Sequence, residues 1–120
     1  MANITLLGLD NDLAAQLFGV LDAQGHCVHV SDSLDDAVDP ADTDIVFSTG
    51  DAPNYRELVG ELMRRGRHLA VVVVSRCPDN RRWLDALELG AADYCGAPFE
   101  PVLMRWLVDS VMRRDRAAAA

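Results

Sequence analysis

Five short apolar runs, each followed by residues at helical spacing, constrain what this chain can fold into. The clearest run is His68 to Ser75 (HLAVVVVS), which is rich in β-branched residues and predicts a strand. The other four strands are expected at Ile4 to Leu9, His26 to Val30, Asp44 to Thr49 and Ala92 to Cys95. Apolar runs with little alternation are typical of strands that are buried on both faces of a parallel sheet.

Helical patterns fill the intervals between these runs. Apolar residues recur at helical spacing over 13–21, 55–62, 83–87 and 103–111, and a short helix is expected from Ser31 or Ser33 to Val38. Strands that alternate with helices predict an α/β fold, a (βα)5 doubly wound parallel sheet with helices on both faces. In such sheets, functional sites lie beyond the carboxyl ends of the strands.

Composition narrows the range of functions. A chain of 120 residues fits one domain over 1–120, with 1–116 folded and a frayed tail over 117–120. The net charge of −8 makes nucleic acid a poor partner, because phosphate binding needs a clustered positive patch. No apolar run is long enough for a membrane span, and the first residues do not resemble a signal peptide, so we expect a cytoplasmic protein.

The basic, cysteine and histidine residues argue against three further kinds of chemistry: lysine-dependent catalysis, a disulfide framework and a histidine metal triad. All eleven basic residues are arginine, so no mechanism of this chain uses a lysine ammonium. Cys27, Cys77 and Cys95 form no CxxC pair, which favours reduced thiols over a disulfide framework. His26, His29 and His68 are too scattered for a metal triad by spacing, and each is interpreted as structural or surface histidine.

The stretch from Leu84 to Pro101 (LDALELGAADYCGAPFEP) is the most specific motif. With Ala86, Gly90, Ala91 and Tyr94 ahead of Pro98-Phe99, it resembles the fourth helix, fifth strand and lysine-proline turn of the receiver domain of two-component response regulators. The resemblance covers essentially the whole chain. It implies the CheY-like, flavodoxin-like strand order 2-1-3-4-5 and a role in phosphorelay signal transduction rather than an enzymatic one.

Receiver domains take phosphate from a histidine kinase onto an aspartate, and this chain departs from the residues that such chemistry needs. The alignment places the acidic pair on Gly8 and Leu9, the acceptor on Thr49 and the lysine on Ala97; a one-residue shift at the first strand would place the pair on Leu9 and Asp10 instead. It retains the hydroxyl at Ser75, the switch aromatic at Tyr94 and the proline at Pro98, which follows a cis peptide in the family. The resemblance therefore implies a degenerate receiver, or pseudo-receiver, that is not phosphorylated on aspartate.

Two alternatives stay open from the sequence. One is a phosphorylatable regulator with a non-standard acceptor, Asp51 or Asp10, in which Asp10, Asp12 and Asp51 form a weak cation site for an ion such as Mg²⁺. Helix capping by Asp10 and Asp12, with Asp51 in an exposed loop, is the favoured interpretation of these residues, and no cofactor is expected. The other alternative is a small-ligand-binding α/β domain that shares only the topology.

The expected output is protein–protein interaction. Trp83, Met104, Arg105 and Trp106 lie on the two helices that flank the fifth strand, and in the family this face carries dimer and partner contacts. Exposed tryptophan with arginine is typical of an interface anchor. We therefore expect a homodimer or a component of a histidine-kinase pathway at this face; a partly buried aromatic that covers the sheet edge is the alternative.

Overall fold

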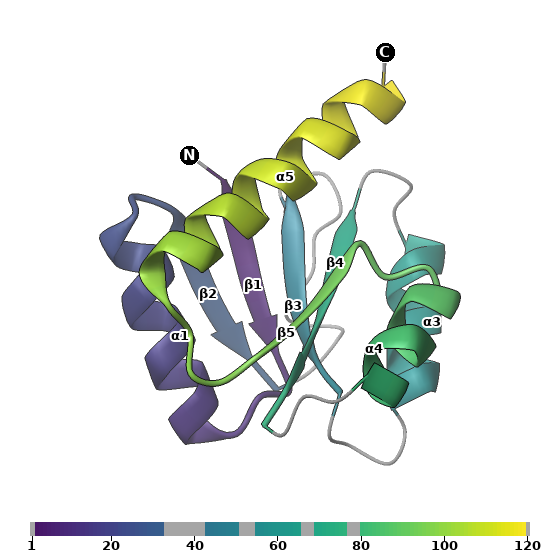
Figure 1. The fold of residues 1–120 in the computed structure, drawn as a ribbon, viewed down its shortest axis with the longest axis horizontal. Helices are drawn as coiled ribbons and strands as arrows, with labels where there is room; N and C mark the ends of the chain where they lie inside the picture. Colours follow the sequence, from purple (N-terminus) through teal and green to yellow (C-terminus); the bar gives the residue numbers. More distant parts are fainter. Residues whose placement is uncertain (1, 33–42, 51–54, 66–68, 77–79, 120) are drawn as a thin grey trace.

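A five-stranded parallel sheet forms the centre of the molecule (Figure 1). The computed structural model describes residues 2–32, 43–50, 55–65, 69–76 and 80–119. Within these ranges the strands are β1 (Asn3–Leu7), β2 (Cys27–Ser31), β3 (Ile45–Thr49), β4 (Ala70–Ser75) and β5 (Asp93–Gly96). They lie in the order β2-β1-β3-β4-β5, and every neighbouring pair is parallel. The predicted doubly wound sheet with order 2-1-3-4-5 is confirmed.

Helices cover both faces of the sheet. The described helices are α1 (Asn11–Ala23), α3 (Tyr55–Arg65), α4 (Asn80–Glu88) and α5 (Pro101–Ala119). In Figure 1, α1 and α5 lie over one face, and α3 and α4 lie over the other. The short helix expected between β2 and β3 falls outside the described residues. Helix α5 extends as far as Ala119, and the frayed tail over 117–120 stays a prediction.

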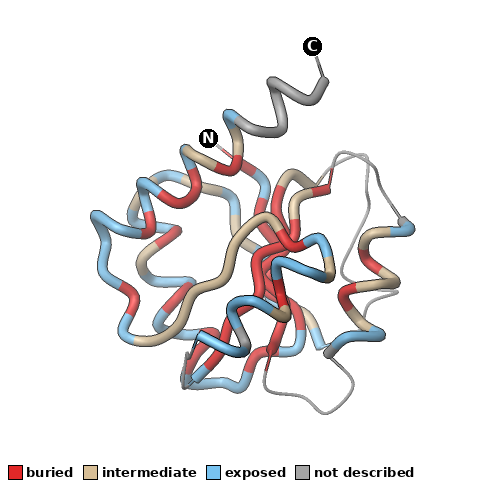
Figure 2. Tube along the Cα trace, turned by 45° about the vertical axis from the view of Figure 1, so that its right-hand side comes forward, coloured by how far each residue is buried: buried red, intermediate tan, exposed pale blue. Residues whose placement is uncertain are grey.

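Two apolar layers, one on each face, enclose the sheet. The first joins Ile4, Leu6 and Phe47 to Leu17 of α1 and Val108 of α5. The second joins strand residues to α3 and α4, with its members being Leu7, Val46, Val59, Leu62, Leu69, Val71, Val73, Ala86 and Ala91. All five residues of β3 are buried, and Figure 2 shows the central strands almost entirely red. Burial on both faces explains why the strand sequences do not alternate.

Helix α5 turns a different residue inward than its sequence suggests. The pattern predicts Leu103 on the buried stripe and Met104 at the surface, but Leu103 is 59% exposed and Met104 only 3%. Met104, Leu107, Val108 and Val111 follow the i, i+3, i+4, i+7 spacing of one helix face. The expectation of Met104 as a surface anchor is therefore wrong, since its side chain belongs to the core.

Helix α4 also buries less than expected. Ala86 is fully buried against the sheet, whereas Trp83, Leu84 and Leu87 are exposed. A small residue at the contact lets the helix lie close to the strands, so its large apolar side chains point away from the core. The apolar spacing over 83–87 therefore does not mark a buried stripe, and Trp83, predicted as an interface residue, is 43% exposed. Among the described residues, no helix has the length and apolar character needed to cross a membrane.

Candidate functional site

The carboxyl ends of the strands lie at the same end of the sheet and bring together the residues that the alignment selected. Gly8 follows β1, Thr49 ends β3, and Ser75 ends β4. The register pairs Leu7 with Ser48 and Thr49 with Val74, so these ends are level with one another. Residues more than forty positions apart in the sequence thus form one small region, as parallel topology requires.

Gly8 and Thr49 lie against each other in this region. Gly8 has φ +69°, and a Cβ added to it would stand 3.3 Å from Cγ2 of Thr49. Thr49 is 8% exposed, and Leu9 is 6% exposed with its side chain in the first apolar layer. At the three positions aligned with the acidic pair and the acceptor, the structure therefore has a glycine, a core leucine and a nearly buried threonine.

Asp10 is the carboxylate closest in sequence to this region, and its two oxygens have separate partners. Oδ1 accepts hydrogen bonds from the backbone N–H groups of Asp12 and Leu13, each at 3.0 Å, which makes Asp10 the N-cap of α1. Oδ2 accepts a hydrogen bond from the Arg76 guanidinium, just after β4. The Leu13 N–H and then Arg76 hold the pKa of the Asp10 carboxyl below its usual value.

Ser75, the Ala97-Pro98 turn and Tyr94 are the other aligned positions at this end of the sheet. Ser75 is fully buried at the end of β4, and Ala97 packs against the first apolar layer. The Ala97-Pro98 peptide bond is cis, as the resemblance implies. Tyr94 contacts the second layer, and its hydroxyl is buried without a hydrogen-bond partner in the described part of the chain. The aromatic ring therefore points inward.

A divalent cation would need several oxygen ligands at this edge. The described residues contain no group of three or more histidine, cysteine, aspartate or glutamate side chains that could hold a metal ion. Asp12 is exposed in the first turn of α1, and Asp51 lies outside the described residues. Of the three carboxylates considered for a cation site, Asp10 has its oxygens engaged by the helix cap and by arginine.

Known proteins give a clear answer on the fold. No protein-family model and no curated protein sequence matches the chain. Among solved structures, a response regulator receiver domain from Clostridium thermocellum superposes with a TM-score of 0.81 at 16% identity, covering 98% of this chain and 99% of that one. The chain has the fold of a response regulator receiver domain.

Two further structures support this fold. The non-phosphorylated HemR receiver domain from Leptospira biflexa has a TM-score of 0.76 at 19% identity, with 93% of this chain and 94% of that chain covered. NtrX from Brucella abortus, in complex with ATP, has a TM-score of 0.86 at 18% identity. That match covers 98% of this chain but 28% of NtrX, so the chain corresponds to one part of that longer protein.

In this receiver fold, the surface formed by α4, β5 and α5 is rich in exposed apolar side chains. A groove of about 300 Å³ lies between β5 and α5, with Tyr94, Pro98, Leu103 and Trp106 among its lining residues. Trp106 is 62% exposed, as its position off the helix stripe predicts. Arg105 is exposed and lines a different groove from Trp106.

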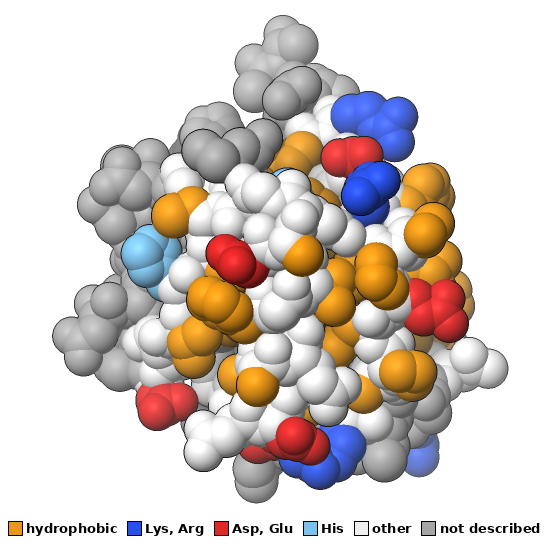
Figure 3. Space-filling view, turned by 90° about the vertical axis from the view of Figure 1, so that its left-hand side faces the viewer, with side chains coloured by type: hydrophobic (Ala, Val, Ile, Leu, Met, Phe, Trp, Pro, Cys, Tyr) orange, Lys and Arg blue, Asp and Glu red, His pale blue; other side chains and the backbone are white. Residues whose placement is uncertain are grey.

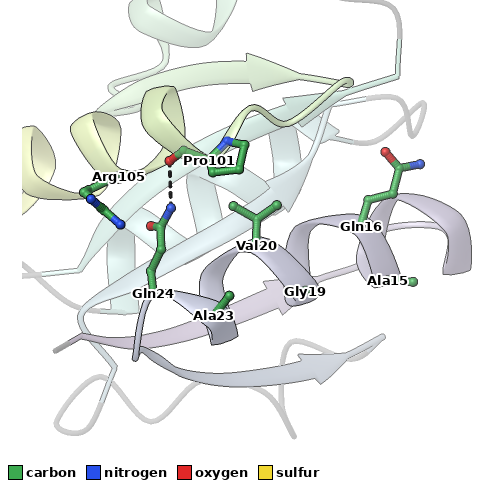
Figure 4. A pocket seen from close by; sticks show the side chains of 8 residues that line it. All are labelled: Ala15, Gln16, Gly19, Val20, Ala23, Gln24, Pro101 and Arg105. Carbon is green, nitrogen blue, oxygen red and sulfur yellow. Dashed lines mark hydrogen bonds between the residues drawn. The ribbon is translucent and has the colours of Figure 1, made fainter.

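That second groove lies between α1 and α5, and nothing in the sequence pattern predicted it. Ala15, Gly19 and Ala23 leave space along α1, and Pro101 and Arg105 of α5 form the opposite wall (Figure 4). The side-chain amide of Gln24 donates to the Pro101 carbonyl at 2.7 Å and so ties the two helices together. The signal available in sequence is the row of small residues four apart.

Proposed function

We propose that this chain is a receiver-like signalling domain that is not phosphorylated on aspartate and acts through protein–protein contacts. The position of Gly8 beside Thr49 carries the proposal. Where the alignment puts an acidic residue beside the phosphate acceptor, a glycine without a side chain faces a threonine, and a Cβ added to it would stand 3.3 Å from Thr49 Cγ2. A threonine hydroxyl cannot form the acyl phosphate that an aspartate forms.

The local charges support the same conclusion. Phosphoryl transfer requires positive charge around the transferred group, supplied by a metal ion held between carboxylates and by a basic side chain. Here the Asp10 carboxylate accepts from Arg76 and from the helix N-terminus instead. The chain has no lysine to replace the residue aligned with Ala97. An arginine paired to a carboxylate does not reproduce a lysine aimed at a phosphoryl oxygen.

The direct test is to treat the whole chain with acetyl phosphate and Mg²⁺ and to measure its intact mass. We expect no added phosphoryl group, while an active receiver domain in a parallel reaction becomes labelled. Stoichiometric labelling that hydroxylamine removes would identify an acyl phosphate and overturn the proposal. Asp51→Asn and Asp10→Asn variants would then identify the acceptor. A hydroxylamine-stable label would instead point to a hydroxyl.

The output surface of the proposed module is the α4–β5–α5 face, defined by Trp83, Leu84, Leu87, Leu103 and Trp106. Eight large apolar side chains are exposed among the described residues, and six of them lie on α4 or α5. An exposed apolar concentration of this kind marks an interaction surface. We assign it to a protein partner in the cytoplasm, either a second copy of this chain or a component of a histidine-kinase pathway.

Sedimentation velocity over a range of protein concentrations tests the second-copy form. We expect a concentration-dependent dimer that Trp106→Ser weakens, because an exposed tryptophan in a groove is a typical energetic anchor. Phe18→Ser is the matched control, since Phe18 is a 38% exposed aromatic on α1. A dimer that both variants weaken equally, or a strict monomer, would remove the second copy as the partner at this face.

A further inference from the structure

The outer edge of the sheet carries a pair of metal-ligand side chains that the proposed function does not use. Cys27 and His29 are both exposed on β2, and Sγ of Cys27 lies 3.9 Å from Nε2 of His29. Residues two apart on a strand point to the same face. The two side chains therefore stand next to each other at the surface. Figure 3 looks onto the left-hand side of Figure 1, where β2 lies, and shows a histidine ring open to solvent.

We propose that Cys27 and His29 bind Zn²⁺ and that a second copy of the chain completes the site. Thiolate and imidazole are the side chains that Zn²⁺ prefers. A tetrahedral zinc ion with ordinary bond lengths holds a sulfur and a nitrogen ligand about 3.6 Å apart. The observed 3.9 Å is close to that separation, so a small rotation of the side chains brings both atoms onto one ion.

The position of the pair in the sheet explains why the partner is a second copy. Two ligands do not close a tetrahedral site, which needs four. β2 is the first strand in the sheet order, with β1 as its neighbour. Cys27 N–H donates to Ala2, and the Ser31 carbonyl accepts from Gly8, so both backbone groups face β1. Because alternate residues turn their backbone groups to opposite sides, those of Val28 point to the outer edge.

An antiparallel pairing of two β2 edges centred on Val28 uses those outward groups. In that register, Val28 of each copy forms the hydrogen-bonded pair, and Cys27 of one copy stands opposite His29 of the other. Such positions are non-hydrogen-bonded pairs, in which Cα atoms are about 4.5 Å apart and side chains are closest. Val28 packs against the layer under α1 and α5, so all four ligands project together from the other face.

The binding step balances simply. Each Cys27 thiol loses a proton to solvent as its sulfur bonds to the ion, and each neutral His29 donates a ring-nitrogen lone pair. The product is a two-cysteine, two-histidine site holding one Zn²⁺ between two chains. The site involves neither Asp10 nor Thr49, and β2 and β5 are at opposite ends of the sheet order. Failure of the proposed function would therefore leave this inference standing.

The experiment uses the untagged, metal-free full chain under a phosphine reductant, which prevents a disulfide between copies. Calorimetric titration with Zn²⁺ should give one ion per two chains, and sedimentation velocity should show a dimer that a chelator dissociates. Cys27→Ser and His29→Ala should each weaken zinc binding by more than about 100-fold, because even second-shell losses cost up to that factor. His29→Cys should restore binding, since it returns a ligand.

Two control variants and a spectrum make the result decisive. Cys77→Ser, which removes a different thiol, and Trp106→Ser should both leave the zinc titration unchanged. Co²⁺ in place of Zn²⁺ should give the visible bands of a tetrahedral ion with a thiolate charge-transfer band, which Cys27→Ser abolishes. Absence of zinc binding, binding that survives loss of both ligands, or a one-to-one complex that stays monomeric would each overturn the proposal.

Discussion

Arg76 pairs with Asp10 across the ends of β4 and β1, and the same Asp10 carboxylate caps α1. The side chains of Asp10 and Arg76 are 40% and 57% exposed, so the pair is near the surface. Its two charges neutralise each other beyond the carboxyl ends of the two strands. The pairing and the cap together link β4 to the start of α1.

The first prediction separates the charge of Asp10 from its capping role. Asparagine caps helices about as well as aspartate, so Asp10→Asn keeps the cap and loses the pairing with Arg76. The pKa of Asp10 is lower in the folded protein than its ordinary value of 3.8. Its charge therefore adds to the stability of the fold at pH values above 3.8, and this contribution is lost as the pH falls through the lower pKa of the folded state. We expect Asp10→Asn to be less stable than the parent protein at neutral pH.

Urea unfolding at a series of pH values measures this difference. The gap between parent and Asp10→Asn should be constant above the ordinary aspartate pKa and should narrow in more acidic solution. Arg76→Gln should show a smaller gap of the same sign, because the Leu13 N–H still lowers the pKa of Asp10, and adding Arg76→Gln to Asp10→Asn should change stability little further. A gap that widens toward acid pH would show that the charge of Asp10 does not stabilise the fold.

The second prediction concerns the place of Gly8 beside Thr49. Gly8→Ala places a Cβ at 3.3 Å from Thr49 Cγ2 at a φ of +69°, and a left-handed conformation costs an ordinary residue about 1–2 kcal/mol. We expect the free energy of unfolding to fall by at least that amount. Chemical denaturation measures it.

Gly19 supplies the matched control for this change. It lies inside α1, and a Cβ added there meets nothing within 4 Å. Gly19→Ala should therefore raise stability by about 0.5–1 kcal/mol, because alanine is the better helix former. Adding Thr49→Ser to Gly8→Ala should recover only the steric part of the loss. Equal effects of the two glycine changes would contradict the conformation described for Gly8.

The strands were predictable because burial on both faces leaves a direct signal in the sequence, whereas their order in the sheet was implied by the resemblance to receiver domains. The runs around Phe47 and Val72 are apolar without alternation, and both residues are fully buried. The pairing of Asp10 with Arg76 was not predictable in the same way. These residues are 66 positions apart, and only the parallel topology brings the ends of their strands together.

Helix faces were harder to predict than helices. In α5, Leu103 and Met104 are adjacent and similarly apolar, so the spacing alone does not decide which one faces the sheet. In α4, Ala86 makes the contact with the sheet, and its small side chain carries little weight in an apolar pattern beside Trp83. Packing distance, which a sequence does not contain, decides both cases.

The third prediction tests which face of α5 is buried by changing two neighbouring residues. Met104→Ala removes a side chain that is 3% exposed and should cost about 2–5 kcal/mol, as core truncations do. Leu103→Ala changes a 59% exposed side chain and should shift stability by no more than about 0.5 kcal/mol. Thermal and urea unfolding of the two variants give the comparison. A larger loss for Leu103→Ala would reverse the orientation of α5.

The fourth prediction concerns the reactivity of two cysteines. Burial, followed by the nearby Asp93, raises the pKa of the Cys95 thiol from 9.0 to about 12, whereas Cys27 is exposed on β2. Thiolate is the reactive form of cysteine. At mildly alkaline pH, the thiolate fraction of Cys95 is about a thousandfold smaller than it would be with a pKa of 9.0. Iodoacetamide should therefore modify Cys27 first in the folded protein.

Peptide mass spectrometry after a timed reaction distinguishes the cysteines by sequence. Cys27 should be alkylated while Cys95 stays unmodified, and both should react at similar rates in denaturant, because unfolding removes the burial that raises the pKa of Cys95. If the zinc site on β2 exists, Zn²⁺ should slow the alkylation of Cys27, since coordination to the ion lowers the nucleophilicity of its sulfur. Alkylation of Cys95 as fast as that of Cys27 in the folded chain would contradict its partly buried position against the first apolar layer.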